Sequence, residues 1–339
     1  MSLDRYSRQI LFTPIGKQGQ EKLLASRVTM IGCGALGTGL ANNLARAGVG
    51  FMRIVDRDFI EMNNLQRQLL FDETDVQENL PKAVAGANRI MKINSDIKTE
   101  PIVADVNYTN VEEFIKDADI VLDGTDNFET RFLLNDACVK HGKTWIYGGC
   151  VGSYGLVMVV IPGQTACVRC VFENAPPPGV APTCDTAGVL NTIASIISSY
   201  QSTEAVKILT GNMAAVNKNL LSIDIWSNQF MQLKTAKNAD CPVCGQKKFE
   251  FLEAKEGTHI TSLCGRNAVQ ITQKIPAKMD FADISKRLSQ LGKVTYNKFL
   301  LKFEQNECEI TLFTDGRAIV KGTNDPAKAR TLYAKYVGS

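Results

Sequence analysis

A glycine-rich turn between an apolar strand and a helix constrains the fold of this chain more than any other feature. The stretch TMIGCGALGTG contains Gly32, Gly34 and Gly37 in the spacing G-x-G-x-x-G, between a β-rich segment at 27–31 and a helical pattern at 35–47. Glycines at such a turn let the backbone approach a nucleotide phosphate, and the helix N-terminus favours negative charge. The motif predicts a Rossmann-like fold and a bound nucleotide, but it does not separate NAD from ATP.

Strands and helices alternate after this turn, which predicts an α/β fold with a parallel, doubly wound sheet. Further strands are expected at 51–56, 100–105, 120–123 and 144–149, and further helices at 82–93 and 128–140. The segments 152–163 and 219–234 look like antiparallel strands that extend the sheet, and they flank a helix at about 189–209. The sheet is therefore expected to be mainly parallel with an antiparallel extension.

The length of 339 residues is typical of two domains. The composition changes after CPVCGQKK, so we place a nucleotide-binding domain at 1–248 and a small α+β domain at 249–339. In the second domain we expect strands at 268–271, 299–303, 309–313 and 318–321, with helices at 280–291 and 326–336.

Charge and hydropathy exclude several classes of partner. The net charge is +3, which gives no reason to expect nucleic acid as a partner. The N-terminal stretch MSLDRYSRQI is charged where an export signal would be apolar, and the apolar run YGLVMVVIPG is too short to span a membrane. We expect a cytoplasmic protein without a membrane partner.

The residues after the glycine turn favour ATP over NAD. Asp56 ends the second predicted strand, where an acidic side chain can hold ribose hydroxyls. Asn64 and Arg67 follow in NNLQRQ, and Lys82 follows in LPKA. Hydride transfer needs no such cations, whereas Arg67 and Lys82 together can neutralise a triphosphate. Each cation alone would be read as a solvated surface residue.

Two carboxylates lie beyond the fourth predicted strand, in the stretch DGTDN. Asp123 and Asp126 therefore fall at the edge of the sheet where α/β proteins bind ligands. A carboxylate at this place can hold Mg²⁺ between phosphates, or it can cap the helix that follows. The residues themselves leave both readings open.

Four of the ten cysteines form two C-x-x-C pairs, Cys167 with Cys170 and Cys241 with Cys244. Four thiolates are the ligands of a closed, tetrahedral zinc site, and a chain without an export signal favours metal binding over disulfides. We predict a structural zinc ion without a catalytic role. Cys184 stands apart in a Pro/Gly-rich loop just before a helix, where a thiol becomes more reactive.

Together these residues resemble the ThiF/MoeB/HesA adenylyltransferases, bacterial relatives of the ubiquitin-activating enzymes. The resemblance covers about residues 4–246 and rests on RYSRQI, GCGALG, the D-x-D at 56–58, NNLQRQ, PKA, DGTDN, the cysteine pairs and TCDTAGV. Members form an acyl-adenylate from ATP and the C-terminal glycine carboxylate of a ubiquitin-like sulfur-carrier protein, releasing pyrophosphate. The resemblance therefore implies ATP and Mg²⁺ as cofactors and such a carrier as the partner.

The resemblance also implies a role for each matching residue in the nucleotide site. Asp56 would bind the ribose, with Asp58 beside it. Asn64, Arg67 and Lys82 would contact the phosphates.

The remaining roles implied by the resemblance concern catalysis and partners. Asp126 would serve Mg²⁺ and the transition state. Arg8 would reach the triphosphate of a neighbouring subunit, so that the active unit would be a homodimer. Cys184 would take part in a covalent or sulfur-transfer step, with a cysteine desulfurase or a sulfurtransferase as the sulfur donor.

Other functions remain open at this stage. The carrier could be ThiS-like, for the thiazole of thiamine, which overall resemblance favours slightly, or MoaD-like, for molybdopterin. The glycine motif alone would suit an NAD-dependent oxidoreductase, and the fold could serve a binding scaffold without chemistry. A relative that adenylates a peptide or a tRNA-linked carboxylate is a further alternative.

Overall fold

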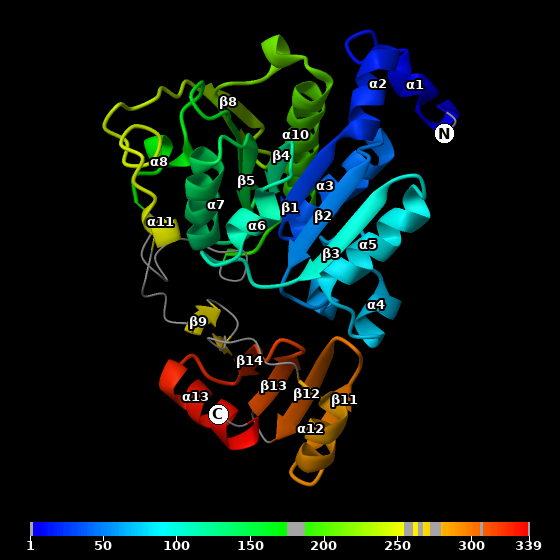
Figure 1. Ribbon diagram of the computed structural model, residues 1–339, viewed down its shortest axis with the longest axis vertical. Coiled ribbons are helices and arrows are strands. Elements are labelled where there is room, and N and C mark those ends of the chain that lie inside the picture. Colours follow the sequence, from blue (N-terminus) through cyan, green and yellow to red (C-terminus); the bar gives the residue numbers. More distant parts are fainter. Residues whose placement is uncertain are drawn as a thin grey trace. The chain divides into compact units, whose positions relative to one another are not determined.

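The computed structural model describes residues 3–174, 187–253, 260–263, 267–271, 279–305 and 308–337. The contacts between residues divide the chain into two compact units near residue 254. The first unit contains an eight-stranded sheet of order β3-β2-β1-β4-β5-β6-β7-β8 (Figure 1). Its strands are β1 Arg27–Ile31, β2 Phe51–Asp56, β3 Lys98–Val103, β4 Ile120–Asp123, β5 Trp145–Val151, β6 Tyr154–Val160, β7 Leu220–Asp224 and β8 Gln229–Leu233.

The pairing of these strands confirms a mixed sheet that is mainly parallel. All neighbours from β3 to β5 pair in parallel, whereas β5, β6, β7 and β8 pair antiparallel. The order of the parallel strands reverses between β1 and β4. In open α/β sheets ligands bind at this reversal, beyond the carboxyl ends of the strands.

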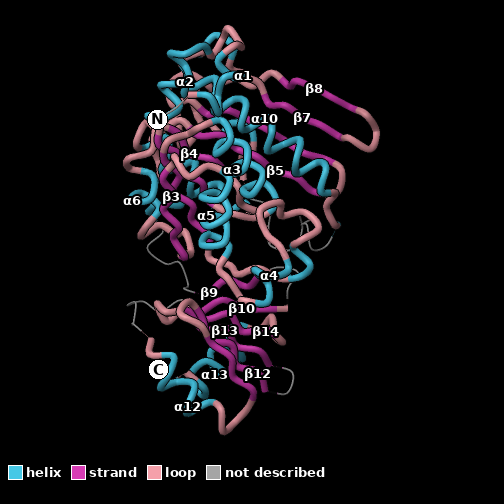
Figure 2. The backbone as a smooth tube through the Cα atoms, turned by 90° about the vertical axis from the view of Figure 1, so that its right-hand side faces the viewer, coloured by secondary structure: helices cyan, strands magenta, loops and turns pink. Residues whose placement is uncertain are grey.

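Helices cover both faces of this sheet, because consecutive residues of the inner strands point to opposite faces and are apolar on both. Met30 of β1 packs with α3 (Ala35–Ala47), α5 (Lys82–Ile93) and α10 (Asn191–Thr210). Figure 2 shows these three helices along one face. Ile31, the next residue, packs with α6 (Val111–Ile115) and α7 (Phe128–Lys140) on the other face. This two-sided burial is what defines a doubly wound sheet.

Shorter elements complete the first unit. They are α1 Ser7–Ile10, α2 Gly16–Ala25, α4 Glu73–Gln77, α8 Val168–Val171 and α11 Glu250–Glu253, with 3₁₀ turns at Asp4–Tyr6, Met62–Asn64 and Met213–Ala215. The helix α11 packs on α7 of this unit. Among the described residues, no helix combines the length and the apolar character that crossing a bilayer requires.

The second unit contains an antiparallel sheet of order β11-β12-β13-β14-β10-β9. Its elements are β9 Ile260–Leu263, β10 Ala268–Ile271, α12 Phe281–Leu288, β11 Lys293–Tyr296, β12 Leu300–Gln305, β13 Cys308–Phe313, β14 Ala318–Lys321 and α13 Pro326–Tyr336. Apolar side chains of α12 and α13 pack with those of the sheet in one core. The α+β character expected of this region is therefore present.

Candidate active site and metal centre

The turn after β1 is held in place by glycine packing. Gly32 has a φ of +90°, and a Cβ on it would lie 2.5 Å from the carbonyl oxygen of Gly124, which follows β4. A Cβ on Gly37 would lie 2.1 Å from the carbonyl oxygen of Gly32. Both distances are far shorter than van der Waals contact, so the fold itself requires these two glycines.

Gly34 differs from these two glycines because the structure leaves room for a Cβ on it. A Cβ on Gly34 would meet nothing closer than 3.9 Å, where it would find the Gln68 amide nitrogen and the Gly124 carbonyl oxygen. Gly34 is also the N-cap residue of α3, whose first backbone N–H groups need acceptors from elsewhere. A helix N-terminus with room beside it favours the approach of an anion such as a phosphate.

Gln68 is a residue of this site that the sequence analysis missed. It is buried, and its Oε1 has no hydrogen-bond partner among the described residues. Gln68 lies in NNLQRQ, but an uncharged amide gave no signal of its own. A buried acceptor without a donor, next to Gly34, fits a ligand that carries hydroxyl or amino groups as well as phosphate.

Asp56 connects the end of β2 to the glycine turn. Its Oδ2 accepts a hydrogen bond from the backbone N–H of Cys33 at 2.6 Å, and its Oδ1 accepts one from Asp58 at 2.7 Å. Burial raises the pKa of Asp56, while the nearby Lys82 ammonium opposes that rise. Each carboxylate oxygen has more than one lone pair, so both can still accept from ribose hydroxyls.

Lys82 begins α5 and is 4% exposed. Its Nζ donates to Oδ2 of Asp58 at 3.2 Å, and its backbone N–H donates to the Asp58 carbonyl at 2.9 Å. The structure therefore brings Asp56, Asp58 and Lys82 together at the carboxyl end of β2. A lysine held this way can exchange its carboxylate partner for a phosphate.

Asn64 and Arg67 lie on the segment that links β2 to α4. Asn64 is buried, and its Oδ1 accepts from the backbone N–H of Glu61 at 3.2 Å. Arg67 is half-buried and donates to the Asn63 carbonyl at 2.8 Å. The segment is joined to α3, because the backbone N–H of Leu69 donates to Thr38 Oγ1 at 3.1 Å. Two of the three predicted phosphate ligands, Asn64 and Arg67, are thus on the segment that also carries Gln68.

The two carboxylates of DGTDN lie in different surroundings. Asp123 is fully buried, and its oxygens accept from the Thr125 backbone N–H at 2.9 Å and from Arg131 Nε at 3.0 Å. Asp126 is exposed, and the helix cap is Asn127, which accepts from the Thr130 backbone N–H at 2.9 Å. Asp123 therefore supports the turn, whereas Asp126 is not used as a cap.

The structure does not bring the other two predicted catalytic residues into this cluster among the residues that it describes. Arg8 is exposed on α1, a segment at the N-terminus of the unit. Cys184 lies outside the described residues. In the described part of the chain, no carboxylates converge in a group of three that could hold a cation unaided. Magnesium bound through Asp126 would thus need oxygens from the nucleotide itself.

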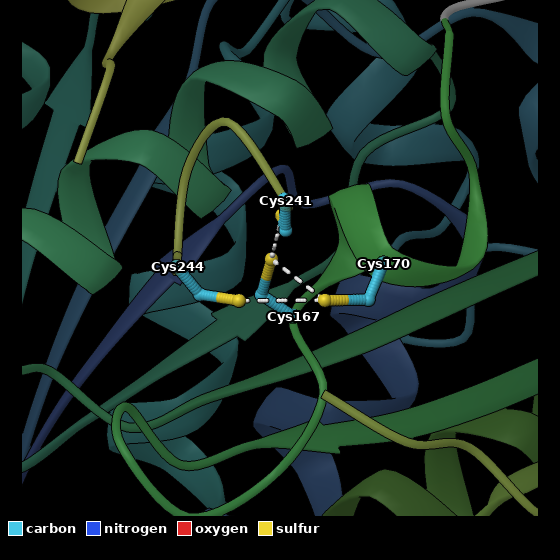
Figure 3. Close-up of side chains that lie close together, drawn as sticks. All are labelled: Cys167, Cys170, Cys241 and Cys244. Carbon is cyan, nitrogen blue, oxygen red and sulfur yellow. Dashed lines mark hydrogen bonds between the residues drawn. The ribbon is translucent and has the colours of Figure 1, made fainter. Parts of the chain in front are cut away.

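The four cysteines predicted to bind zinc come together in the first unit (Figure 3). Cys167 and Cys170 flank the start of α8, and Cys241 and Cys244 come from a turn more than 70 residues later. Their sulfur atoms all lie within 4.8 Å of one another, and the pairs 167–170, 167–241 and 170–244 are 3.9, 3.6 and 3.3 Å apart.

These distances fit a tetrahedral ion and do not fit disulfides. Zinc–sulfur bonds of about 2.3 Å place tetrahedral sulfurs about 3.8 Å apart, whereas a disulfide needs about 2.05 Å. All four cysteines are free thiols. Burial raises the pKa of the Cys244 thiol to about 11, so a cation is needed to hold the thiolate form. A four-sulfur set of this geometry has no ligand position left for a substrate.

Comparison with known proteins assigns the fold and the family. The sequence model of the ThiF family matches residues 6–243, and the chain therefore belongs to this family. Among solved structures, Escherichia coli MccB in a complex with ATP aligns with a TM-score of 0.61 and 23% identity, over 71% of this chain and 75% of MccB. That likeness supports the mixed α/β fold.

Two curated relatives differ in how much of the chain they match. The sulfur carrier protein ThiS adenylyltransferase of Bacillus subtilis is 45% identical over 98% of this chain and 99% of its own length. The adenylyltransferase and sulfurtransferase MOCS3 of Culex quinquefasciatus is 39% identical over 71% of this chain, but over 55% of its own length. The first match covers nearly the whole chain, and the second leaves more than a quarter of the chain unmatched.

Proposed function

We propose that this chain is an adenylyltransferase that uses ATP to activate the C-terminal glycine carboxylate of a ThiS-like sulfur carrier for thiamine thiazole synthesis. The observation that carries the proposal is the 45% identity to the Bacillus subtilis enzyme over nearly the whole of both chains. A MoaD-like carrier for molybdopterin is the alternative. An NAD-dependent oxidoreductase is less well supported, because its chemistry gives Lys82 and Arg67 no task.

The reaction needs charge neutralisation more than acid–base chemistry. A carboxylate is already an anion at neutral pH, so it can attack the α-phosphorus without a general base. A carboxylate oxygen–phosphorus bond forms, the bond from the α-phosphorus to the leaving oxygen breaks, and pyrophosphate departs. Cations that hold the triphosphate in line would supply most of the rate enhancement.

Each nucleotide-binding residue has a proposed role in this reaction. The phosphates would bind next to Gly34, at the N-terminus of α3. Asp56 would accept hydrogen bonds from the ribose hydroxyls. Lys82 would leave Asp58 for a phosphate oxygen, with Arg67 and Asn64 as further phosphate ligands. Their pairing within the protein supports this proposal, because exchangeable partners keep these groups ordered without a ligand.

The remaining roles concern metals and partners. Asp126 would bind Mg²⁺ together with the phosphates, and Arg8 of a neighbouring copy would complete the site in a homodimer. The four cysteines would hold a structural zinc ion, which supplies a fixed cross-link between distant segments. Cys184 would act in sulfur transfer, with a cysteine desulfurase or a sulfurtransferase as donor. We place the enzyme in the cytoplasm.

Adenylation can be tested by ATP–pyrophosphate exchange with ThiS-like and MoaD-like carriers side by side. We expect exchange with the ThiS-like carrier and none when its terminal glycine is removed. Lys82→Met should lower kcat/KM for ATP by about 10²–10³-fold, since it removes a positioned cation. Lys92→Met changes an exposed lysine at the other end of the same helix and should leave the rate unchanged.

Three results would contradict the proposal. The absence of exchange with both carriers would contradict the proposed activity. A Lys82→Met variant with a kcat/KM for ATP within threefold of wild type would contradict the proposed role of this lysine. Tight binding of NADH without binding of ATP would favour the oxidoreductase instead.

A further inference from the structure

Arg57 lies between the two acidic residues of the D-x-D stretch, and the sequence analysis gave it no role. It follows β2 directly, and its side chain is 24% exposed. Its Nη1 donates to Oδ1 of Asp105 at 2.8 Å, and its Nε lies 3.8 Å from Oδ1 of Asp58. Asp105 comes just after β3, so Arg57 joins the carboxyl ends of two neighbouring strands.

A third carboxylate also acts on this guanidinium. Burial acts to lower the pKa of Arg57, but the charges of Asp105, Asp58 and Asp126 outweigh it and raise that pKa. Asp126 follows β4, on the far side of β1 from β2. Arg57 therefore stands among carboxylates that come from the ends of three different strands.

The balance of charge at this edge depends on Arg57. Asp56, Asp58 and Asp105 supply three negative charges there, while Lys82 and Arg57 supply two positive ones. The exposed Asp126 interacts electrostatically with both Arg57 and Arg131. Asp123 is already paired with Arg131. Without Arg57, Asp105 would lose its contact with this guanidinium and Asp58 would keep Lys82, at the place where a polyanion has to bind. Both carboxylates are half-buried, so their repulsion of an anionic ligand would then be stronger.

Arg57 also shares Asp58 with Lys82. Oδ2 of Asp58 receives the lysine at 3.2 Å, and Oδ1 faces the arginine at 3.8 Å. A carboxylate divided between two cations holds each of them less strongly than a carboxylate with one partner. The arrangement keeps Lys82 ordered and would still let its ammonium group turn toward a phosphate.

We propose that Arg57 is a positioning residue for ATP, which neutralises the carboxylates at this edge and shares Asp58 so that Lys82 can engage the triphosphate. This inference rests on the proposed function, because it assumes that the anion is a nucleotide. It assigns Arg57 no contact with the reacting atoms. Its effect should therefore fall on ATP binding, with little effect on the chemical step.

The test compares two quantities among variants. The exchange assay with the carrier gives KM for ATP. Calorimetric titration with a non-hydrolysable ATP analogue, carried out without the carrier, gives the dissociation constant. Arg57→Gln should raise KM and the dissociation constant about tenfold or more, with kcat within about threefold of wild type. Arg57→Lys keeps the charge and should lose less. Adding Asp105→Asn to Arg57→Gln should recover most of the affinity, because it removes one unbalanced carboxylate.

Arg89→Gln is the matched control. Arg89 also faces two carboxylates, Asp72 and Asp75, but it lies about two turns further along α5 than Lys82. The Arg89→Gln variant should bind ATP like wild type. Every variant should keep its zinc and its melting temperature. If the Arg57 variants keep their zinc and their melting temperature, they are still folded, and their weaker binding of ATP does not come from a merely structural role of Arg57.

Several outcomes would overturn the inference. One is wild-type affinity in both Arg57→Gln and Arg57→Lys. Another is a loss that Asp105→Asn does not relieve, because that indicates direct contact between Arg57 and phosphate. A wild-type protein that binds the ATP analogue but adenylates neither carrier would contradict the proposed function alone, and the titrations would still decide the role of Arg57.

Discussion

The glycine-turn edge and the cysteine cluster lie in the same unit, but they are organised in opposite ways. In the cluster, four thiols from two distant segments converge to distances that leave room for one ion and nothing else. At the glycine-turn edge, the charged groups pair with one another, Gly34 leaves room for a Cβ, and Gln68 Oε1 has no donor within the described part of the chain.

This difference reflects what each region has to hold. A permanent ion is best served by ligands that converge on it and exclude everything else. A nucleotide has to enter and leave, so its ligands need partners of their own when it is absent. An unpaired buried charge would cost several kcal/mol, and internal pairs such as Lys82 with Asp58 avoid that cost.

The largest effect should follow from removing one cysteine ligand. Cys241→Ser should abolish the binding of zinc, because three thiolates and a hydroxyl form a much weaker site. Structural zinc contributes about 10 kcal/mol or more in small peptides, and the apolar core of this unit should limit the loss to about 4 kcal/mol. For a unit of this size that lowers Tm by about 10 °C. Metal analysis and thermal unfolding measure both quantities.

Cys150→Ser provides the control, because Cys150 is a half-buried cysteine of β5 that does not belong to the cluster. It should keep one zinc ion per chain. If Cys241→Ser also kept its full zinc content, the ion would have to be bound elsewhere and the contrast between the two regions would be lost.

The sequence predicted the elements that carry strong local signals. Apolar strands between helices located β1, β2 and β4, and paired cysteines identified the four thiols, because both signals come from residue type and spacing. It missed β11, an edge strand of four mostly exposed residues, because a run this short gives too few alternations to be recognised. The strand β9 was also missed.

The site was harder to predict, because its charges depend on tertiary partners. Asp123 and Asp126 occupy the same stretch, and only the fold shows that Arg131 pairs with the first and that Asn127 caps the helix. Gln68 and Arg57 were missed because an amide and an arginine are ordinary surface residues by type. Their meaning arises from burial and from neighbours that are distant in sequence.

Two alanine substitutions in the glycine turn should separate folding from binding. Gly32→Ala should destabilise the unit by about 3 kcal/mol, because it forces a side chain into a positive φ and against Gly124. Gly34→Ala should cost less than about 1 kcal/mol, since its Cβ would make only ordinary van der Waals contacts, at 3.9 Å. It should nevertheless raise KM for ATP about tenfold, because a methyl group would occupy the space proposed for phosphate.

The two variants serve as controls for each other, since they make the same substitution two residues apart. Denaturant unfolding gives the stabilities, and the exchange assay gives KM. A Gly34→Ala variant that bound ATP like wild type would show that the space next to Gly34 is not part of the nucleotide site. Equal destabilisation by both changes would show that the turn has one role throughout.

The smallest expected effect concerns Asp136, a buried acid of α7 on which burial outweighs the opposing charge of Arg169. Its Oδ2 accepts from the Phe251 backbone N–H at 2.9 Å, while Oδ1 has no partner among the described residues. Burial raises its pKa to about 7. The folded protein therefore keeps a proton that the unfolded chain releases above about pH 4, so stability falls as pH rises from about 4 to 7.

Asp136→Asn should remove this dependence, because an amide oxygen can still accept from Phe251 and carries no charge to desolvate. A shift of about three pH units sets an upper limit of about 4 kcal/mol, and we expect about 2 kcal/mol of stabilisation at pH 8 that vanishes near pH 4. Denaturant unfolding between pH 4 and 8 measures it, with the exposed Asp96→Asn as the control. If the variant were less stable than wild type at pH 8, Asp136 would be ionised and compensated in the fold, as the acids around the glycine turn are.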